Sequence, residues 1–473
     1  MNDSLVCGID VGSTNVKVLL MSSSTRTLWS SSIPVPRVDD GIGLVTDAAA
    51  LVKTLERMMI EGWAAVGSRQ PLGAIAVTGV GEDGIPVDAE LRPLDFAIPW
   101  FDRRASGQAL GLQEQAGNDA RSGVPIDFSR TAAKWRWLRD HRPKVMQTAC
   151  HWIALTDYPA VWWSRKPFIS ETLAARTGCY DVFARRWMEH HLDAAAAPPL
   201  PPVVPAGKIL GTVAQGNLTA RGVASGSTLV VAGGHDHPVA ASAVRRLDPA
   251  ALVDSLGTAN LMYDEIAHIA PRSDPYVAFS VPALGRSGVA CLGVFEFASS
   301  LEPFRRRDGG AMLRAVLAAD RAPGPPGYTD EIVEALQRTL NPGLSVPANH
   351  GVPALRAVLE ATCMYARRMR AAIRQAGSTS ERLYAVGGWA RSRALMELRA
   401  SVLGEPLFTI DEEELTALGV AMIANDAICG PGAVPLRRDT QRVEPRADWQ
   451  DTYQRIYPEV REQLQVMKAA APA

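Results

Sequence analysis

The hydrophobic pattern of this chain consists of short apolar runs that end in loops of glycine and other small residues. Five of these runs have the length of buried strands, and they are Leu5–Asp10, Gly73–Thr78, Thr228–Ala232, Leu252–Leu256 and Arg382–Val386. Apolar runs of this length between glycine-bearing loops predict strands. In open α/β sheets the loops at the strand exits carry the chemistry, so these loops are the first places to look for a site.

Longer stretches repeat their apolar residues every three to four positions, as amphipathic helices do. This spacing predicts helices at 46–67, 240–246, 355–377 and 412–425, a Trp-rich helical region at 131–163, and a C-terminal helix over 449–464 that breaks at Pro458. Residues 170–181 are expected to form a polar loop, and 194–205 a surface connection. The charged, Gly- and Pro-rich residues 305–350 predict a mobile surface insertion.

Length, charge and cysteine usage limit the organisation and the partners. A chain of 473 residues predicts two domains, 1–247 and 248–473, with the boundary near Leu247–Ala250. The 49 Lys and Arg residues nearly balance 50 Asp and Glu residues, which argues against nucleic-acid and membrane-surface partners. The six cysteines form no Cys-x-x-Cys pair, and no signal-peptide or membrane-spanning pattern is visible, so a soluble cytoplasmic protein is expected.

The first glycine-bearing loop lies inside a predicted β-hairpin, Leu5–Met21. Asp10 ends its first strand, Gly12–Thr14 form the turn, and Lys17 opens the second strand. Backbone donors and one ammonium group suit a triphosphate, although the loop lacks the Gly-x-x-x-x-Gly-Lys pattern of a Walker A motif. An ordinary hairpin with polar surface residues is the alternative.

A second group of loops combines a carboxylate with a phosphate cradle. Asp236 follows the glycine pair Gly233–Gly234 at a strand exit, and Gly257 and Thr258 downstream offer backbone N–H groups and a hydroxyl. A carboxylate beside a phosphate loop suggests a base that takes a proton from a hydroxyl while a phosphoryl group arrives. The alternative for each loop alone is a polar turn between core strands.

Two further segments have the residue types that bind polyols. Glu82 and Asp83 stand between glycines in the loop Gly79–Gly84, where carboxylates accept hydrogen bonds from vicinal hydroxyls. The indole of Trp100 can pack on a sugar, and Asp102 can add a polar contact. Solvated turn acids and a helix-capping Asp102 are the alternatives, and Arg176 and Asp181 are weaker candidates for the rim of the site.

These motifs, together with the glycine pair Gly387–Gly388 that opens a helix, resemble the FGGY family of carbohydrate kinases. The resemblance covers almost the whole chain and rests on four motifs in order, which are Gly8–Lys17, Gly233–Asp236, Asp254–Ala259 and Gly387–Gly388. It implies two α/β domains of the ribonuclease H-like actin and sugar kinase fold around a central cleft. It also implies ATP-dependent, Mg²⁺-assisted phosphorylation of a hydroxyl on a neutral sugar or polyol, such as a xylulose-type pentulose.

The resemblance also implies a role for each matching residue. Asp236 would be the general base and a substrate contact, and Asp10 would orient the metal through water. The ATP contacts implied are Gly12, Ser13, Thr14, Lys17, Gly257, Thr258, Gly387 and Gly388, and the other substrate contacts are Glu82, Asp83, Trp100 and Asp102.

The chain departs from the family at two places. Trp389 stands where the adenosine motif often has a third glycine, and Glu82-Asp83 matches neither the Arg-Glu pair of glycerol kinases nor the Met-His pair of xylulokinases. The identity of the substrate therefore stays open, and so does the question of whether the chain forms a homodimer. The rival interpretations are a catalytically silent sugar-binding regulator and a chaperone or actin-like assembler of the same superfamily.

Overall fold

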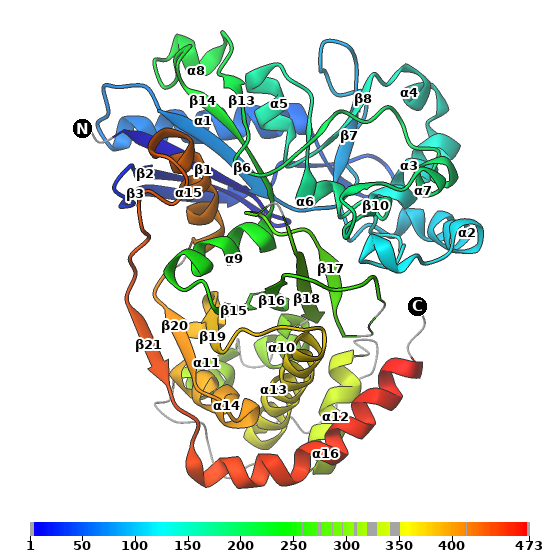
Figure 1. The fold of residues 1–473 in the computed structure, drawn as a ribbon, viewed down its shortest axis with the longest axis vertical. Helices are drawn as coiled ribbons and strands as arrows, with labels where there is room; N and C mark the ends of the chain where they lie inside the picture. Colours follow the sequence, from blue (N-terminus) through cyan, green and yellow to red (C-terminus); the bar gives the residue numbers. More distant parts are fainter. Residues whose placement is uncertain are drawn as a thin grey trace.

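The computed structural model describes residues 4–257, 259–272, 274, 276–285, 287–295, 297–306, 310–318, 329–340, 351–412 and 414–470. Two mixed β-sheets organise these residues (Figure 1). The first sheet contains, in spatial order, β13 (Ile209–Thr212), β14 (Leu229–His235), β6 (Ala74–Gly79), β1 (Leu5–Val11), β2 (Asn15–Ser22) and β3 (Thr27–Pro34). The second contains β17 (Ala278–Ser280), β18 (Val289–Phe295), β16 (Asn260–Ile266), β15 (Ala251–Leu256), β19 (Arg382–Val386), β20 (Leu407–Ile410) and β21 (Thr440–Val443).

The two sheets repeat one topology. In the first, β1 pairs antiparallel with β2 and parallel with β6, which pairs parallel with β14. In the second, β15 pairs antiparallel with β16 and parallel with β19, which pairs parallel with β20. The apolar runs predicted from the sequence form the parallel cores of both sheets, because strands buried on both faces need near-continuous apolar side chains. The α/β fold class is thereby confirmed.

Sixteen α-helices surround the sheets in the described part of the chain. Those of the first half are α1 (Ala48–Ala65), α2 (Ser106–Ala116), α3 (Thr131–His141), α4 (Pro143–Thr148), α5 (Tyr158–Ser164), α6 (Glu171–Ala174), α7 (Glu189–Ala194), α8 (Asn217–Ala220) and α9 (Asp236–Leu247). Those of the second half are α10 (Phe297–Arg306), α11 (Ala311–Ala318), α12 (Thr329–Leu340), α13 (Val352–Gln375), α14 (Arg393–Leu403), α15 (Leu415–Cys429) and α16 (Ala447–Ala470).

Helices α9 and α15 lie between the two sheets and hold them together. They pack against each other, and α15 covers β1 and β6 of the first sheet although it belongs to the second half of the chain. One apolar cluster accordingly runs from Val6 of β1 through α9 and α15 to Val253 of β15. Figure 1 shows α9 at the junction of the two halves. The division at Leu247–Ala250 remains a prediction.

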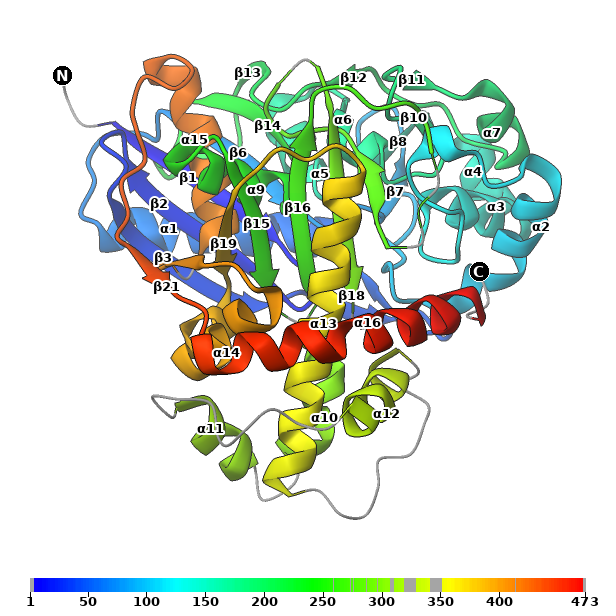
Figure 2. The same cartoon turned by 60° about the horizontal axis from the view of Figure 1, so that its bottom comes forward.

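Two helix predictions are wrong. Residues 131–163 are not continuously helical, because β8 (His151–Ala154) pairs with β7 (Gly84–Val87) in a separate small sheet. The C-terminal helix does not break at Pro458 but runs through it, packed across α13 and α14 (Figure 2). Tyr453, Val460 and Leu464 are buried on its inner face, so apolar burial outweighs the backbone hydrogen bond that proline removes.

Three more pairs of short strands shape the loops of the first half. They are β4 (Arg37–Asp39) with β5 (Leu44–Thr46), β9 (Ile169–Ser170) with β12 (Val203–Val204), and β10 (Tyr180–Asp181) with β11 (Arg186–Trp187). Residues 170–181, expected as a polar loop, are instead a largely buried β9–α6–β10 segment. Half of the expected surface insertion at 305–350 lies outside the described residues. The described half includes α11 and α12, whose Leu313, Ile332 and Leu336 are buried in the core of the second half, so for these helices the prediction is wrong.

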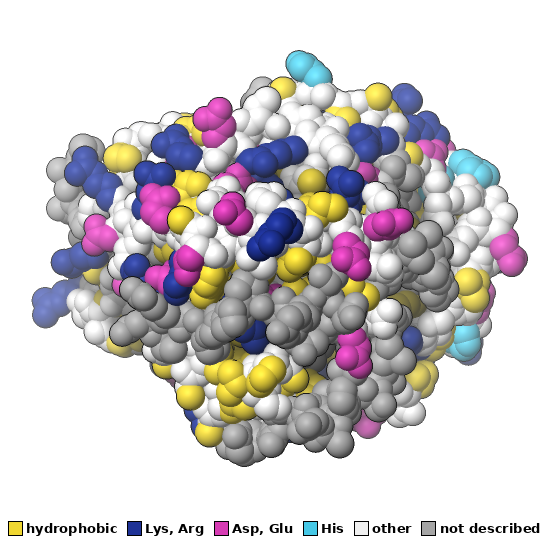
Figure 3. Space-filling view, turned by 90° about the horizontal axis from the view of Figure 1, so that it is seen from below, with side chains coloured by type: hydrophobic (Ala, Val, Ile, Leu, Met, Phe, Trp, Pro, Cys, Tyr) yellow, Lys and Arg dark blue, Asp and Glu magenta, His cyan; other side chains and the backbone are white. Residues whose placement is uncertain are grey.

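The surface has charges of both signs. In Figure 3, Lys and Arg side chains alternate with Asp and Glu side chains on the face seen from below, as expected for a chain with balanced charges. Across the ranges that the structure describes, no helix combines the length and the apolar character needed to cross a bilayer.

Candidate active site

The ends of three parallel strands bring the first group of predicted residues to one edge of the first sheet. Asp10 on β1 lies in register with Thr78 on β6, and Gly79 at the end of β6 lies in register with His235 on β14. The hydroxyl of Thr78 donates to the carbonyl of Gly234 at 2.8 Å, which ties the two strand ends together. Residues separated by more than 200 positions in the sequence therefore meet at this edge.

Asp236 is the first residue of α9, directly after β14. Its Oδ1 accepts the backbone N–H of His237 at 2.7 Å and lies 3.2 Å from Nε2 of His235. Burial raises the pKa of the Asp236 carboxyl, and the nearby His237 opposes this rise. A raised pKa makes the carboxylate a stronger base than a free aspartate, which is the property that a proton acceptor needs.

Asp10 is a buried acid with one carboxylate oxygen that has no partner in the described part of the chain. Its side chain is 7% exposed, and Oδ1 has no hydrogen-bond partner among the described residues. Burial and the negative charge of Asp236 raise its pKa to about 8, while Lys17 opposes the rise. An orphaned oxygen beside a second carboxylate is what a hard cation such as Mg²⁺ would stabilise, so this corner fits the ion.

The rest of the first loop is held by contacts from distant segments. Lys17 pairs with Glu414, which precedes α15, at 2.7 Å. The carbonyl of Ser13 accepts a hydrogen bond from Nη2 of Arg37 at 2.6 Å. Within the loop, the backbone N–H of Gly12 donates to the carbonyl of Asn15 at 3.1 Å. The predicted turn is present, and the ammonium group of Lys17 has a carboxylate partner.

Glu82 lies between two arginines. Its Oε1 accepts from Nη1 of Arg130 at 2.7 Å and from Nε of Arg176 at 2.9 Å. Burial opposes ionisation of Glu82, but the two guanidinium groups outweigh it and hold its pKa well below the usual range. A Cβ at Gly81 would lie only 2.6 Å from Cγ of Arg176 and 2.9 Å from Cδ2 of His235, so this loop packs directly against the Asp236 segment.

Asp83 points to the other side of the same loop. It pairs with Lys134 at 3.2 Å, and Nζ of Lys134 also donates to the carbonyls of Glu82 and Ile98. Burial raises the pKa of Asp83, which Lys134 opposes. The alternative that the two loop acids are solvated turn residues is wrong, because Glu82 is 8% and Asp83 3% exposed. Their contact with substrate stays a prediction. Cations from α3 and from the residues beside α3 and α6 outweigh the cost of burying them.

Trp100 and Asp102 lie in the segment that leads to α2. The ring of Trp100 meets that of Phe101 edge to face at 5.7 Å, and Arg37 lies over the Phe101 ring at 4.9 Å. Asp102 caps a 3₁₀-helix, Arg103–Ala105, and pairs with Arg104 at 2.8 Å. Asp102 therefore has the structural role of the capping alternative, and its contact with substrate stays a prediction.

The second group of predicted residues meets at the edge of the second sheet. Gly387 has φ +94°, and a Cβ there would lie 2.5 Å from the carbonyl oxygen of Leu256, so the glycine pair Gly387–Gly388 packs against the end of β15. Gly388 begins a 3₁₀-helix that precedes α14, and Gly257 donates its N–H to the carbonyl of Ala259 at 3.0 Å. Thr258 lies outside the described residues.

Comparison with known proteins decides the family. The N-terminal domain of the FGGY family of carbohydrate kinases matches residues 5–243, and its C-terminal domain matches residues 326–428. The chain belongs to the FGGY family of carbohydrate kinases. It is therefore a phosphotransferase of an ATP-using family.

Relatives and solved structures of this FGGY kinase cover nearly the whole chain. It is 26% identical to a xylulose kinase of Streptomyces coelicolor (92% of this chain, 90% of that one) and 24% identical to a glycerol kinase of Trichlorobacter lovleyi (90% of each). Crystal structures of xylulose kinase from Rhodospirillum rubrum and gluconate kinase from Lactobacillus acidophilus share its fold. Their TM-scores are 0.82 and 0.84, their identities 21% and 17%, and the matches cover 98% and 99% of this chain and 99% of each of those.

The sequence analysis missed most of the cations that surround Glu82 and Asp83 in this FGGY kinase. Arg37, Arg130 and Lys134 received no assignment, and Arg176 was expected only at the rim. One signal was available, because Arg130 and Lys134 are spaced four apart at the start of a helical segment and so lie on one face. No sequence pattern connects that face with Glu82 and Asp83.

Proposed function

We propose that this FGGY kinase transfers the γ-phosphoryl group of ATP to a hydroxyl of a neutral sugar or polyol, with Asp236 as the general base. A ketose such as a xylulose-type pentulose, or a polyol, is the substrate that we favour. The observation that carries the proposal is the meeting of Asp236, Asp10 and the Glu82–Asp83 loop at one edge of the first sheet. A base, a metal-orienting acid and a polar substrate loop are the parts that hydroxyl phosphorylation needs.

Asp236 accepts the proton of the attacking hydroxyl. Its burial favours the proton-bound form, so the carboxylate gains more by taking a proton than an exposed aspartate would. In phosphoryl transfer the proton leaves the nucleophile late, and positioning supplies much of the rate. The hydrogen bond from the N–H of His237 fixes one carboxylate oxygen and leaves the other for the substrate.

Asp10 would hold Mg²⁺ through water. When bound with the nucleotide, Mg²⁺ neutralises the charge of the phosphates. The buried, unpartnered Oδ1 of Asp10 supports this assignment, since such an atom is costly without a ligand. Gly12, Ser13, Thr14 and Lys17 would face the phosphates from the first sheet, with Gly257 and Thr258 across from them and Gly387 and Gly388 at the adenine.

The charges around the substrate loop support a neutral substrate. Four acids (Asp10, Glu82, Asp83 and Asp236) are accompanied by four cations (Arg37, Arg130, Lys134 and Arg176). A balanced site offers hydrogen-bond donors and acceptors together without net attraction for an anion, and vicinal hydroxyls use both. Trp100 would add an apolar face for the carbon chain.

Release of ADP with a panel of ketoses, aldoses, polyols, sugar acids and sugar phosphates tests the substrate class. A neutral compound is expected to give the highest kcat/KM. A sugar acid or sugar phosphate as the best substrate would contradict the proposal, and no ADP release with any sugar would favour the silent regulator.

The variant Asp236→Asn tests the role of the base. It should lower kcat by about 10²–10⁴ while nucleotide binding stays near that of the wild type. Asp448→Asn is the matched control, because Asp448 is also an acid in the first turn of a helix but is exposed and paired with Arg446. A kcat within tenfold of the wild type in Asp236→Asn would exclude this role.

A further inference from the structure

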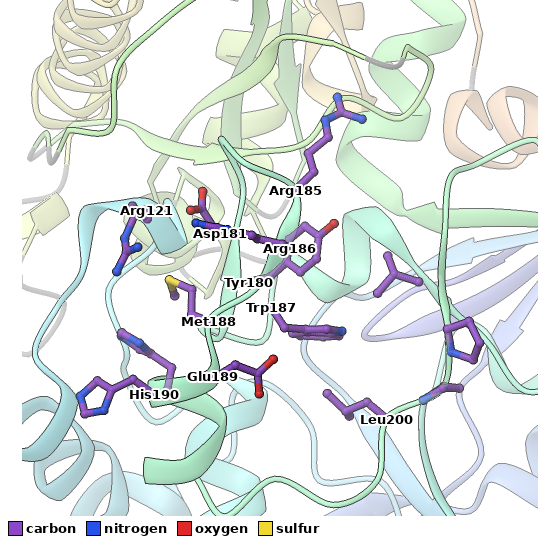
Figure 4. A pocket seen from close by; sticks show the side chains of 14 residues that line it. Arg121, Tyr180, Asp181, Arg185, Arg186, Trp187, Met188, Glu189, His190 and Leu200 are labelled. Carbon is purple, nitrogen blue, oxygen red and sulfur yellow. The ribbon is translucent and has the colours of Figure 1, made fainter.

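A hollow of about 900 Å³ opens in the first half of the molecule, among residues that the proposed reaction does not use. Its walls are the β10–β11 hairpin, the start of α7 and the proline-rich segment Leu200–Val203 (Figure 4). In the close view the Trp187 indole and the Glu189 carboxylate extend in the same direction, toward Leu200, while Arg185 extends away from them. Apolar and charged side chains therefore line the hollow together.

The lining of the hollow includes a buried histidine. His191 is 3% exposed and lines the hollow, yet both of its ring nitrogens are without a partner among the described residues. Burial lowers its pKa, so the ring is neutral and offers one donor and one acceptor. A buried ring with both nitrogens unsatisfied is costly, and a ligand with hydroxyl groups would satisfy them.

The charged side chains that line the hollow differ in whether they already have an ion-pair or hydrogen-bond partner. Arg121 pairs with Asp119 and Arg185 with Glu171, and Oδ1 of Asp181 accepts two backbone N–H groups. Arg186 is exposed and has no ion pair in the part of the chain that the structure describes, so it is the guanidinium that a ligand can use without displacing a carboxylate. Guanidinium groups bind phosphate oxygens with two parallel hydrogen bonds.

We infer that this hollow binds a sugar phosphate. Arg186 would bind the phosphate, His191 and the exposed Glu189 would meet the hydroxyls, and the half-buried indole of Trp187 would cover the apolar face of the sugar. Tyr180 supports that indole from the edge at 5.2 Å. The neutral substrate of the proposed reaction lacks the anionic group that Arg186 selects.

The hollow is connected to the catalytic segment through α6. The hydroxyl of Tyr180 and the guanidinium of Arg185 both bind Glu171, the first residue of α6. The next residue, Thr172, accepts the backbone N–H of His235 at 2.9 Å, one position before Asp236. A ligand that moves the β10–β11 hairpin would thus act on the residue next to the proposed base.

The hollow is also connected to the second half of the molecule. Arg185 donates to the carbonyls of Gly285 and Gly288, in the loop between β17 and β18, at 3.3 and 3.4 Å. A sugar phosphate bound here would therefore change kcat or KM from outside the substrate site, an effect that rests on the proposed function. Binding itself does not depend on it.

Calorimetric titration without ATP tests the binding site. The probes are xylulose 5-phosphate, glycerol 3-phosphate and inorganic phosphate, each added to the wild-type chain, to Arg186→Ala and to Arg69→Ala. Arg69 is an exposed arginine away from the hollow and is the matched control. We expect at least one sugar phosphate to bind the wild type and Arg69→Ala, and to bind Arg186→Ala at least about tenfold more weakly, since one charge-assisted contact is lost.

Equal isotherms for the wild type and Arg186→Ala with both esters would overturn the inference. Inorganic phosphate that binds as tightly as the esters would also overturn it, because Trp187 and His191 would then contribute nothing. His191→Gln, with folding checked by its melting temperature, should weaken the esters and leave inorganic phosphate unchanged. If Arg186-dependent binding is found but no sugar is phosphorylated, the site stands and the proposed function fails.

Discussion

The glycine-bearing hairpin loops after β1 and after β15 have the same topology, but the buried aspartates on these two strands have opposite environments. Asp254, on β15, is fully buried and receives two hydrogen bonds from the guanidinium of Arg399 and one from Asn260. Asp10, on β1, is also buried, but its Oδ1 has no partner among the described residues. Lys17, the cation that opposes the rise of the Asp10 pKa, is paired with Glu414.

We interpret this difference as that between a residue that serves the fold and one that, under the proposed function, serves a ligand. A buried carboxylate is costly unless a cation and hydrogen bonds compensate it, and Arg399 compensates Asp254 within the second half of the chain. For Asp10 the environment adds further negative charge instead, from Asp236 and Glu414. We attribute this unfavourable arrangement to the cation that would accompany the nucleotide.

The largest effect on stability is expected at the compensated acid. Asp254→Asn removes the charge that balances the fully buried Arg399, and breaking such a pair costs about 3–5 kcal/mol. Chemical denaturation measures the loss. Asp10→Asn is the matched comparison and should not destabilise the chain. Equal destabilisation by the two variants would remove the distinction between the loops.

Substitution of Asp10, the acid without a compensating cation, should instead have a large effect on turnover. Asp10→Asn is expected to lower kcat by about 10²–10³, the usual effect of removing one preorganised electrostatic group. Steady-state ADP release at saturating sugar and nucleotide measures it, with circular dichroism to verify the fold. Turnover that stays near the wild-type value would mean that Asp10 does not serve the metal.

The raised pKa of Asp10 should also appear in the pH dependence of stability. Asp10 has a pKa of about 8 in the folded chain and about 4 when unfolded, so the folded state holds the extra proton between these values. Stability of the ligand-free chain should therefore fall as pH rises through this window, by at most about 1.4 kcal/mol per pH unit. Melting temperatures from pH 5 to 9 test this, because the gap between Asp10→Asn and the wild type should widen up to pH of about 8 and then level off.

Both loops could be predicted from the sequence, because glycines after an apolar run are a local signal. Their charge partners could not. Arg399 is 145 residues from Asp254, and Arg130 is 48 residues from Glu82, so only the folded topology brings each pair together. The same reasoning explains why solvated turn acids were an alternative for Glu82 and Asp83, since a glycine-rich loop with two acids indicates exposure when its cations are not visible. Pro458 was misjudged because local propensity was allowed to outweigh apolar burial.

The smallest effect concerns how the first loop is held in place. The polar contacts of the Asp254 loop come from its own sheet and from α14, whereas Ser13 is held by Arg37 from β4. Arg37 lies over Phe101 and adds positive charge near Asp83, so it joins the phosphate loop to the substrate loop. Arg37→Ala should raise the KM for sugar and for ATP about threefold to tenfold each, with kcat nearly unchanged. The variant loses the hydrogen bonds to the Ser13 carbonyl and the Thr46 hydroxyl, but the reacting groups remain.

A double-mutant cycle of Arg37→Ala with Asp83→Asn measures that connection. If Arg37 couples the two loops, the effects on kcat/KM for sugar should be non-additive, with a coupling free energy of about 0.5–1.5 kcal/mol. Arg37→Lys keeps the charge but loses the second hydrogen-bonding arm of the guanidinium, so it should restore the KM for sugar more than the KM for ATP. Strictly additive effects would show that Arg37 supports the phosphate loop alone, and the first loop would then be as self-contained as the second.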